Sequence, residues 1–153
     1  MMPLEQKIFK KFTQRGQTLS LAESCTGGLI AHSLTNRPGS SQYFLLGIIA
    51  YDNRTKTKIL KVPASILKKH GAVSFQTASL MAQGVRQILK TSHGLSITGI
   101  AGPGGGTPQK PVGLVFISLS TQNKTIVKRH LFKGSRLAIK KEACKTALKM
   151  LAK

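Results

Sequence analysis

Acidic side chains are scarce in this chain of 153 residues, which has 4 Asp and Glu against 24 Lys and Arg and a formal net charge of +20. With so few carboxylates, glycosidase-like acid–base pairs and multi-carboxylate metal sites are nearly excluded. The four histidines show no spacing typical of metal ligands; they are His32, His70, His93 and His130. We therefore expect no metal and no organic cofactor, and the scarcity of carboxylates favours a hydroxyl nucleophile for any hydrolytic chemistry.

Cysteine and long apolar runs are also scarce. Two cysteines, Cys25 and Cys144, do not suggest a disulfide framework and fit a reduced compartment. The longest apolar run, Phe44 to Tyr51, is too short to span a bilayer and is interrupted by Gly47. The N-terminal residues lack the apolar stretch of a signal peptide. We therefore expect a cytoplasmic protein with no membrane partner.

Aromatic residues make up only 5% of the chain, and tryptophan is absent. A charge of +20 attracts anions, whether phosphorylated metabolites or nucleic acids. The lysines are dispersed along the chain, however, and no aromatic residues are interleaved with them to stack on bases. This pattern favours lysines on solvated faces, so binding of nucleic acid is not expected.

The length and the 41% hydrophobic content fit a single folded domain over residues 1–153. Apolar periodicity and breaker residues predict alternating helices and strands. The expected strands are Thr18–Ala22, Phe44–Tyr51 (buried), Leu95–Ile100, Val112–Thr121 and Thr125–Phe132, the last two joined by a hairpin at Asn123-Lys124. The expected helices are Leu4–Phe12, Thr26–Leu34, Asn53–Leu60, Pro63–His70, one beginning after the N-cap Ser74 and running through Leu89, and Leu137–Leu151. The order predicts a three-layer α/β/α sandwich with a mixed, mostly parallel sheet that ends in a hairpin.

Ser24 is the first candidate for chemistry, because it lies in the run Glu23-Ser24-Cys25-Thr26-Gly27-Gly28 at a predicted strand-to-helix turn. Ligands bind at the carboxyl ends of strands in α/β sheets, and free N–H groups at such a turn can hold a phosphate or an oxyanion. Taken alone, the run fits equally well a helix cap at Ser24 with a tight glycine contact. Cys25 without a basic partner is better interpreted as a small buried residue.

Two further segments follow predicted strands. Tyr51 and Lys56 lie just after the second strand, and a partly desolvated lysine could activate a serine, although most lysines are simply solvated. The segment Thr98–Thr107 is rich in glycine and could form a substrate cradle or a flexible connection. It matches neither a Walker loop nor a dinucleotide fingerprint.

Six motifs in a fixed order resemble the CinA C-terminal domain family, which includes the nicotinamide-nucleotide amidases. The motifs are Ala22–Gly28, Pro38–Ser41, Tyr51–Asn53, His70–Ser74, Gly99–Gly105 and Lys110–Gly113. The similarity extends from about Leu4 to Leu151 and implies an α/β/α sandwich. It also implies a stand-alone amidase that hydrolyses nicotinamide mononucleotide to nicotinic acid mononucleotide and ammonia, with a homo-oligomeric assembly expected.

The resemblance places the family's serine nucleophile on Ser24 and its active-site tyrosine and lysine on Tyr51 and Lys56. We expect the N–H groups near Thr26, Gly27 and Gly28 to hold the oxyanion, and Gly102 to Thr107 with Arg136 to hold the phosphate. The full set of expected substrate-binding residues is Glu23, Thr26, Gly27, Gly28, Thr98, Gly102, Gly104, Gly105, Thr107 and Arg136. The alternative is a catalytically inactive accessory protein that associates with nucleotides or DNA.

Two positions depart from the family pattern. Asp52 replaces the serine of the Tyr-Ser-Asn that is common in the family. Ser135 replaces the aspartate of the common Gly-Asp-Arg. Arg136 is retained, but a carboxylate that could orient it is absent. We therefore expect the phosphate side of the site to be affected more than the chemistry.

Overall fold

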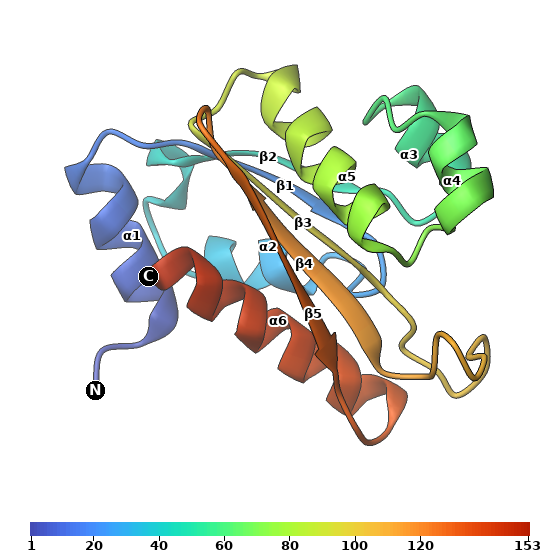
Figure 1. Cartoon of the computed structure of the whole chain (residues 1–153). Coiled ribbons are helices and arrows are strands. Elements are labelled where there is room, and N and C mark those ends of the chain that lie inside the picture. Colours follow the sequence, from blue (N-terminus) through green and yellow to red (C-terminus); the bar gives the residue numbers. More distant parts are fainter.

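The computed structural model describes residues 1–153 and contains a five-stranded sheet covered by helices on both faces (Figure 1). The strands are β1 (Leu19–Glu23), β2 (Phe44–Ile49), β3 (His93–Gly99), β4 (Leu114–Ser120) and β5 (Thr125–Leu131). The helices are α1 (Leu4–Gln14), α2 (Leu29–Thr35), α3 (Asn53–Lys58), α4 (Ala64–His70), α5 (Phe75–Ile88) and α6 (Arg136–Ala152), with a short 3₁₀ helix, η1 (Ser40–Gln42). The predicted α/β sandwich is confirmed.

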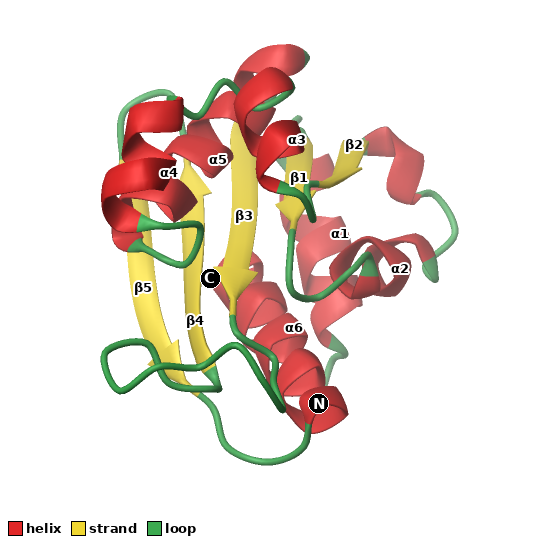
Figure 2. Cartoon of the chain, turned by 90° about the vertical axis from the view of Figure 1, so that its right-hand side faces the viewer, coloured by secondary structure: helices red, strands yellow, loops and turns green.

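The sheet has the order β2-β1-β3-β4-β5. β1 pairs in parallel with both β2 and β3, whereas β4 is antiparallel to β3 and to β5. The strands β1, β2, β3 and β5 therefore point the same way, and only β4 opposes them. The parallel strands β1, β2 and β3 end on the same side of the sheet (Figure 2). The segments that follow them begin after Glu23, Ile49 and Gly99.

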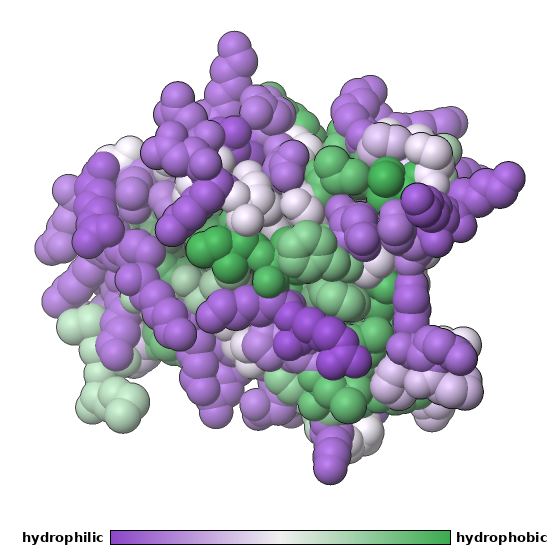
Figure 3. Space-filling model, viewed as in Figure 1, coloured by the Kyte–Doolittle hydropathy of each residue, from purple (hydrophilic) through white to green (hydrophobic).

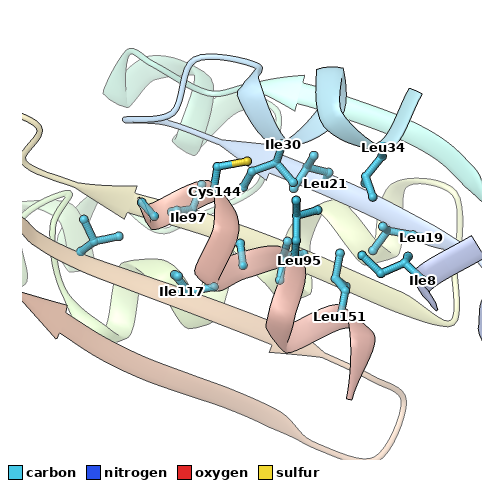
Figure 4. Packing of buried hydrophobic residues seen from close by; sticks show 14 of the residues in the cluster. Ile8, Leu19, Leu21, Ile30, Leu34, Leu95, Ile97, Ile117, Cys144 and Leu151 are labelled. Atoms are coloured by element: carbon cyan, nitrogen blue, oxygen red, sulfur yellow. The ribbon is translucent and has the colours of Figure 1, made fainter. Parts of the chain in front are cut away.

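One layer of helices comprises α1, α2 and α6, and the other comprises α3, α4 and α5 (Figure 1). The larger apolar core lies between the first layer and the sheet and includes Ile8, Leu21, Ile30 and Leu95 (Figure 4). A smaller core between the sheet and α5 includes Met81. Figure 3 shows hydrophilic side chains projecting over much of the visible face, with apolar residues between them. No helix is both long and apolar enough to cross a membrane.

The residues predicted to begin and end α4 and to begin α5 do so in the structure. The Ser74 hydroxyl accepts a hydrogen bond from the Thr77 N–H at 3.1 Å and caps α5. α4 begins directly after Pro63 and ends at Gly71, whose φ of 79° suits glycine. Leu89, expected within α5, lies just beyond its end and is half exposed.

Two expected elements differ from the structure. The helix expected over Thr26–Leu34 begins only at Leu29, because Gly27 and Gly28 have φ values of 61° and 101°, outside the helical range. The strand expected to be buried, β2, lies at the sheet edge, and its side chains alternate between half-buried and exposed. An apolar run alone does not distinguish a central strand from an edge strand that exposes apolar side chains.

Candidate active site

Ser24 lies directly after β1, at the carboxyl end of that strand. Its N–H donates to the Ile97 carbonyl of β3 at 3.0 Å, so the β1–β3 ladder continues through this residue and fixes it. The side chain is 8% exposed. Ser24 is thus held rigidly between two parallel strands, with its hydroxyl at the end of the sheet.

Lys56 is the partner of Ser24. Its Nζ lies 3.2 Å from Ser24 Oγ, 2.6 Å from the Ala50 carbonyl oxygen and 3.3 Å from the Tyr51 carbonyl oxygen. The side chain is only 1% exposed. Burial lowers the pKa of Lys56 below its usual 10.5, and this effect exceeds the opposing influence of Asp52 and Cys25.

The position of Lys56 depends on the helix cap at Asp52. The Asp52 carboxylate accepts a hydrogen bond from the Arg54 N–H at 2.7 Å and so caps α3, which begins at the next residue, Asn53. Asp52 also forms an ion pair with the Arg54 side chain at 2.9 Å. The aspartate that departs from the family pattern is thus a helix cap, and the helix turns Lys56 inward toward Ser24.

A cavity of about 270 Å³ opens over these two residues. Its lining includes eight of the predicted site residues, which are Ser24, Tyr51, Lys56, Thr98, Gly102, Gly104, Gly105 and Arg136. Residues that the sequence did not single out also line it, among them Asn53, Ala72 and Val73. All three belong to motifs quoted above, Tyr51–Asn53 and His70–Ser74, so the family resemblance was the only signal that could have included them.

Tyr51 lines the cavity, but its hydroxyl points to Arg136. Arg136 donates one hydrogen bond to the Tyr51 hydroxyl at 3.0 Å and another to the Gly102 carbonyl at 2.7 Å. The Tyr51 side chain is 60% exposed. The structure therefore joins the ring of Tyr51 to the arginine, and only the backbone carbonyl of Tyr51 reaches Lys56.

The substitution at Ser135 also has a structural explanation. The Ser135 hydroxyl accepts from the Ala138 N–H at 3.3 Å and caps α6, the helix that begins with Arg136. Aspartate and serine are about equally good at this position of a helix. The orientation of Arg136 comes from Tyr51 and Gly102, so the expectation that a missing carboxylate weakens this side is not supported by its contacts.

Four predicted site residues are absent from the cavity lining, and they are Glu23, Thr26, Gly27 and Gly28. The buried Glu23 carboxylate accepts hydrogen bonds from the Thr26 hydroxyl at 2.5 Å and the Gly28 N–H at 3.0 Å. It also accepts from the N–H groups of Ile30 and Ala31 at 3.2 and 2.8 Å. The Gly27 N–H donates to the Ser24 carbonyl at 3.1 Å. Glu23 and Thr26 therefore anchor α2, and the N–H groups of Gly27 and Gly28 are already engaged.

The predicted threonines differ from each other. Thr98 is buried in the cavity wall, and its hydroxyl donates to the Ala72 carbonyl at 2.9 Å, which holds the segment before α5 against β3. Thr107 is exposed and does not line the cavity; its hydroxyl accepts from the Lys110 N–H at 3.0 Å within a local turn. The expected contribution of Thr107 to substrate binding is therefore not supported.

Other candidate groups are less suited to chemistry. Burial raises the pKa of Cys25 to about 12, so its thiol remains protonated. No group of three or more His, Cys, Asp or Glu side chains lies together as a metal site would require. A larger hollow of about 840 Å³ lies between α5 and the β4–β5 turn, but none of its residues pairs a nucleophile with a buried base. The smaller cavity is therefore the candidate active site.

Comparison with known proteins identifies the family of the chain. The family model described as "CinA C-terminal domain" matches residues 1–153. This chain belongs to the CinA C-terminal domain family. A CinA-like protein of Syntrophus aciditrophicus is 49% identical over 97% of this chain and 36% of its own length. The CinA-family chain thus spans about a third of the length of the curated relatives that it matches.

Solved structures resemble the whole fold. The competence/damage inducible protein CihA from Agrobacterium tumefaciens has a TM-score of 0.94 at 39% identity, covering 99% of this chain and 96% of its own. The competence damage-inducible protein A from Klebsiella pneumoniae also has a TM-score of 0.94, at 29% identity, covering 97% of this chain and 92% of its own. The CinA-family fold therefore extends over nearly all of the sequence.

Proposed function

We propose that this CinA-family chain is an amidase that hydrolyses the carboxamide of nicotinamide mononucleotide to nicotinic acid mononucleotide and ammonia. The observation that carries the proposal is the buried Nζ of Lys56 lying 3.2 Å from Ser24 Oγ. A hydroxyl beside a desolvated amine is a nucleophile–base pair of the kind used in acyl transfer. The choice of substrate rests on the family resemblance.

The surroundings of Lys56 suit a base. A neutral amine has two N–H donors and one lone pair, and the carbonyls of Ala50 and Tyr51 accept the two donors. The lone pair then remains for the hydroxyl proton of Ser24. Two carbonyls also stabilise the ammonium that forms when the proton arrives, so Lys56 can take a proton and return it.

The reaction follows from this pair. Lys56 Nζ accepts the Ser24 proton as Oγ bonds to the carboxamide carbon, and it then delivers that proton to the departing nitrogen, which leaves as ammonia. Water attacks the acyl-enzyme, with Nζ accepting one water proton. The C–Oγ bond breaks, the proton on Nζ returns to Ser24 Oγ, and the carboxylic acid product gives its remaining proton, the second one of the attacking water, to solvent and leaves as the carboxylate.

The developing oxyanion needs N–H donors beside Ser24. Among residues 24–28, the N–H groups of Ser24, Gly27 and Gly28 already donate within the protein. Those of Cys25 and Thr26 donate to no protein acceptor. We assign the oxyanion site to Cys25 and Thr26, which differs from the site expected at the two glycines.

The phosphate subsite lies on the other side of the cavity. Arg136, Gly102, Gly104 and Gly105 line it, and the Lys140 ammonium lies beside Gly27, where a Cβ would be 3.7 Å from Nζ. Arginine can present two parallel donors to a phosphate. The Tyr51 hydroxyl accepts a hydrogen bond from this arginine and so helps to position it.

The test is ammonia release from nicotinamide mononucleotide by Ser24→Ala and Lys56→Ala. Losing the base lowers kcat by roughly 10²–10⁴-fold, and losing the nucleophile lowers it at least as much. Lys58→Ala is the matched control, because Lys58 is an exposed lysine on the same helix. Near-wild-type turnover by folded Ser24→Ala would refute the mechanism.

A further inference from the structure

The hollow between α5 and the β4–β5 turn has no part in the proposed function. Its volume of about 840 Å³ is about three times that of the cavity over Ser24 and Lys56, and the two share no lining residue. Three segments form it: residues 59–61 at the end of α3, residues from 80 to 88 in α5, and residues 120–125 of the turn. Figure 1 shows that turn beside the end of α5. A hollow of this size can hold an organic ligand.

Each of the three segments contributes one cation to the hollow, and none contributes a carboxylate. Lys61 follows α3, Arg86 belongs to α5 and Lys124 belongs to the turn. Arg86 is half-buried, and its Nε is covered from solvent and donates to no protein acceptor. None of the three cations forms an ion pair. Three unpaired positive charges around one hollow attract a ligand that carries more than one negative charge.

Side-chain amides are concentrated in the same lining. It holds four of the twelve Asn and Gln residues of the chain, although it comprises only 15 of the 153 residues. The four are Gln83, Gln87, Gln122 and Asn123. Gln83 donates to the Ser79 hydroxyl at 3.1 Å, which leaves its amide oxygen free to accept. An amide offers a donor and an acceptor together, and this pair matches the edge of a nucleic-acid base.

Apolar side chains complete the lining. Ile59 is 48% exposed and Ile88 is 42% exposed, one from the end of α3 and the other from the end of α5. They offer an apolar surface to a planar base, from which inorganic phosphate would gain nothing. No aromatic side chain lines the hollow, so it lacks the stacking surface on which single-stranded nucleic acids bind. The lining therefore suits a nucleotide better than inorganic phosphate or a polynucleotide.

We propose that this hollow binds a nucleotide that carries more than one phosphate. The phosphates lie among Lys61, Arg86 and Lys124, and the base lies against the amides and the two isoleucines. The site is separate from the phosphate subsite at Arg136, because no residue lines both. Binding at the hollow does not depend on the proposed amidase activity.

The hollow adjoins the helix that carries Lys56. The Val62 N–H, one residue after Lys61, donates to the Lys56 carbonyl at 3.0 Å. The Leu60 carbonyl packs so closely against Gly84 of α5 that a Cβ at this glycine would collide with it. A ligand that contacts both segments therefore bears on the helix that positions Lys56. Any effect on turnover rests on the proposed function, whereas the binding itself does not.

The experiment is isothermal titration calorimetry of the wild-type chain with adenosine triphosphate, inorganic triphosphate and adenosine. We expect adenosine triphosphate to bind at least about tenfold more tightly than inorganic triphosphate, because only the nucleotide reaches the amides and isoleucines. Adenosine should bind more weakly than adenosine triphosphate, since it leaves the cations unpaired. Equal affinity for the two triphosphates would overturn the assignment to a nucleotide. No binding of adenosine triphosphate would overturn the site itself.

Lys61→Gly locates the site. Lys61 has a φ of 60°, which glycine adopts freely, so the change removes the ammonium without disturbing the backbone. We expect the Kd for adenosine triphosphate to rise about tenfold through the loss of one charge-assisted contact. The matched control is Lys90→Gly, because Lys90 has a φ of 52°, carries the same charge and lies outside the lining. Its Kd should stay within about twofold of wild type, since salt screens a cation outside the site.

Arg136→Ala distinguishes the hollow from the candidate active site. Arg136 lines the cavity and not the hollow, so this variant should bind adenosine triphosphate as wild type does. Circular dichroism confirms that each variant is folded. An equal loss of affinity in Lys61→Gly and Lys90→Gly would mean that only the net charge matters. A loss confined to Arg136→Ala would place the nucleotide in the cavity, and either result would overturn the proposal.

Discussion

At the scale of single residues, Lys56 shows how the fold gives an ordinary side chain the surroundings of a base. Its amine is enclosed with the Ser24 hydroxyl and two backbone carbonyls, and burial lowers its pKa. Nothing in the sequence around it distinguishes Lys56 from the exposed Lys58 two positions later. The difference lies in the direction that the first turns of α3 give to each side chain.

The lowered pKa of Lys56 predicts the pH dependence of the reaction. A base must be neutral to accept a proton, so kcat/KM rises with pH and levels off above the pKa of Lys56 in the free enzyme. Because burial lowers that pKa, we expect the midpoint to fall below 10.5. Initial rates of ammonia release between pH 6 and 10.5 measure it. A rate that falls with rising pH across this range would mean that Lys56 acts as the ammonium.

Ser135 gives a second prediction at this scale. If it acts as the cap of α6, Ser135→Asp keeps the cap and changes the free energy of unfolding by less than about 0.5 kcal/mol, whereas Ser135→Ala costs about 1 kcal/mol. The KM for nicotinamide mononucleotide should stay within about twofold in both variants, because Tyr51 and Gly102 hold Arg136. Urea unfolding and steady-state kinetics measure the two effects. A much lower KM in Ser135→Asp would indicate that a carboxylate orients Arg136 instead.

At the scale of elements, Glu23 joins the end of β1 to the start of α2. Four donors converge on its buried carboxylate, two of them N–H groups in the first turn of α2. A negative charge at a helix N-terminus is also favourable for the helix dipole. The tight turn that presents Ser24 therefore depends on one of the four acidic residues in the chain.

Replacing this carboxylate should destabilise the fold. An amide cannot accept all four hydrogen bonds and lacks the charge, so Glu23→Gln is expected to lower the free energy of unfolding by about 2–4 kcal/mol. Glu142→Gln is the control, because Glu142 is exposed on α6 and should change stability by less than about 0.5 kcal/mol. Urea denaturation of the two variants compares them. Equal stability would show that Glu23 is dispensable for anchoring α2.

The elements also show which features could be predicted from sequence. The start of α5 and the end of α4 were predicted correctly because their caps, Ser74 and Gly71, are local signals that act within a few residues. The start of α2 was misplaced because Gly27 and Gly28 adopt left-handed φ values, in a turn where the Gly28 N–H donates to the Glu23 carboxylate and the Gly27 N–H to the Ser24 carbonyl. The edge position of β2 depends on strand order, which an apolar run does not encode.

Some features of the candidate site could also be predicted from sequence, and others could not. The residues alone left Ser24 equally well a nucleophile or a helix cap and favoured a solvated Lys56, and the ordered family motifs decided for the catalytic pair. The structure places Lys56 Nζ 3.2 Å from Ser24 Oγ. The partners of Tyr51 and Glu23 could not be predicted, since each depends on a residue or helix start that only the fold brings near. Thr107 follows the glycines in sequence but turns away from the cavity.

At the scale of the whole molecule, positive charge dominates. Asp52 pairs with Arg54, Glu23 is buried against α2, and no other ion pair forms within 4.0 Å. Most of the cations therefore face solvent without a partner, and their summed field surrounds the cavity. Arg136 lines the cavity and extends that positive field to it.

The field predicts how salt affects the reaction. The phosphate of nicotinamide mononucleotide carries more negative charge than its pyridinium carries positive charge, so the positively charged protein attracts the substrate. Between ionic strengths of about 0.01 and 1 M the Debye length shrinks from roughly 30 to 3 Å. We therefore expect kcat/KM to fall severalfold over this range. The turnover number kcat should change little, because Ser24 and Lys56 react within a buried contact that salt screens weakly. Nicotinamide riboside is the matched control substrate: it lacks the phosphate and is cationic, so its kcat/KM should rise with salt. The same salt response for both compounds would mean that the charge of the molecule has no part in substrate capture.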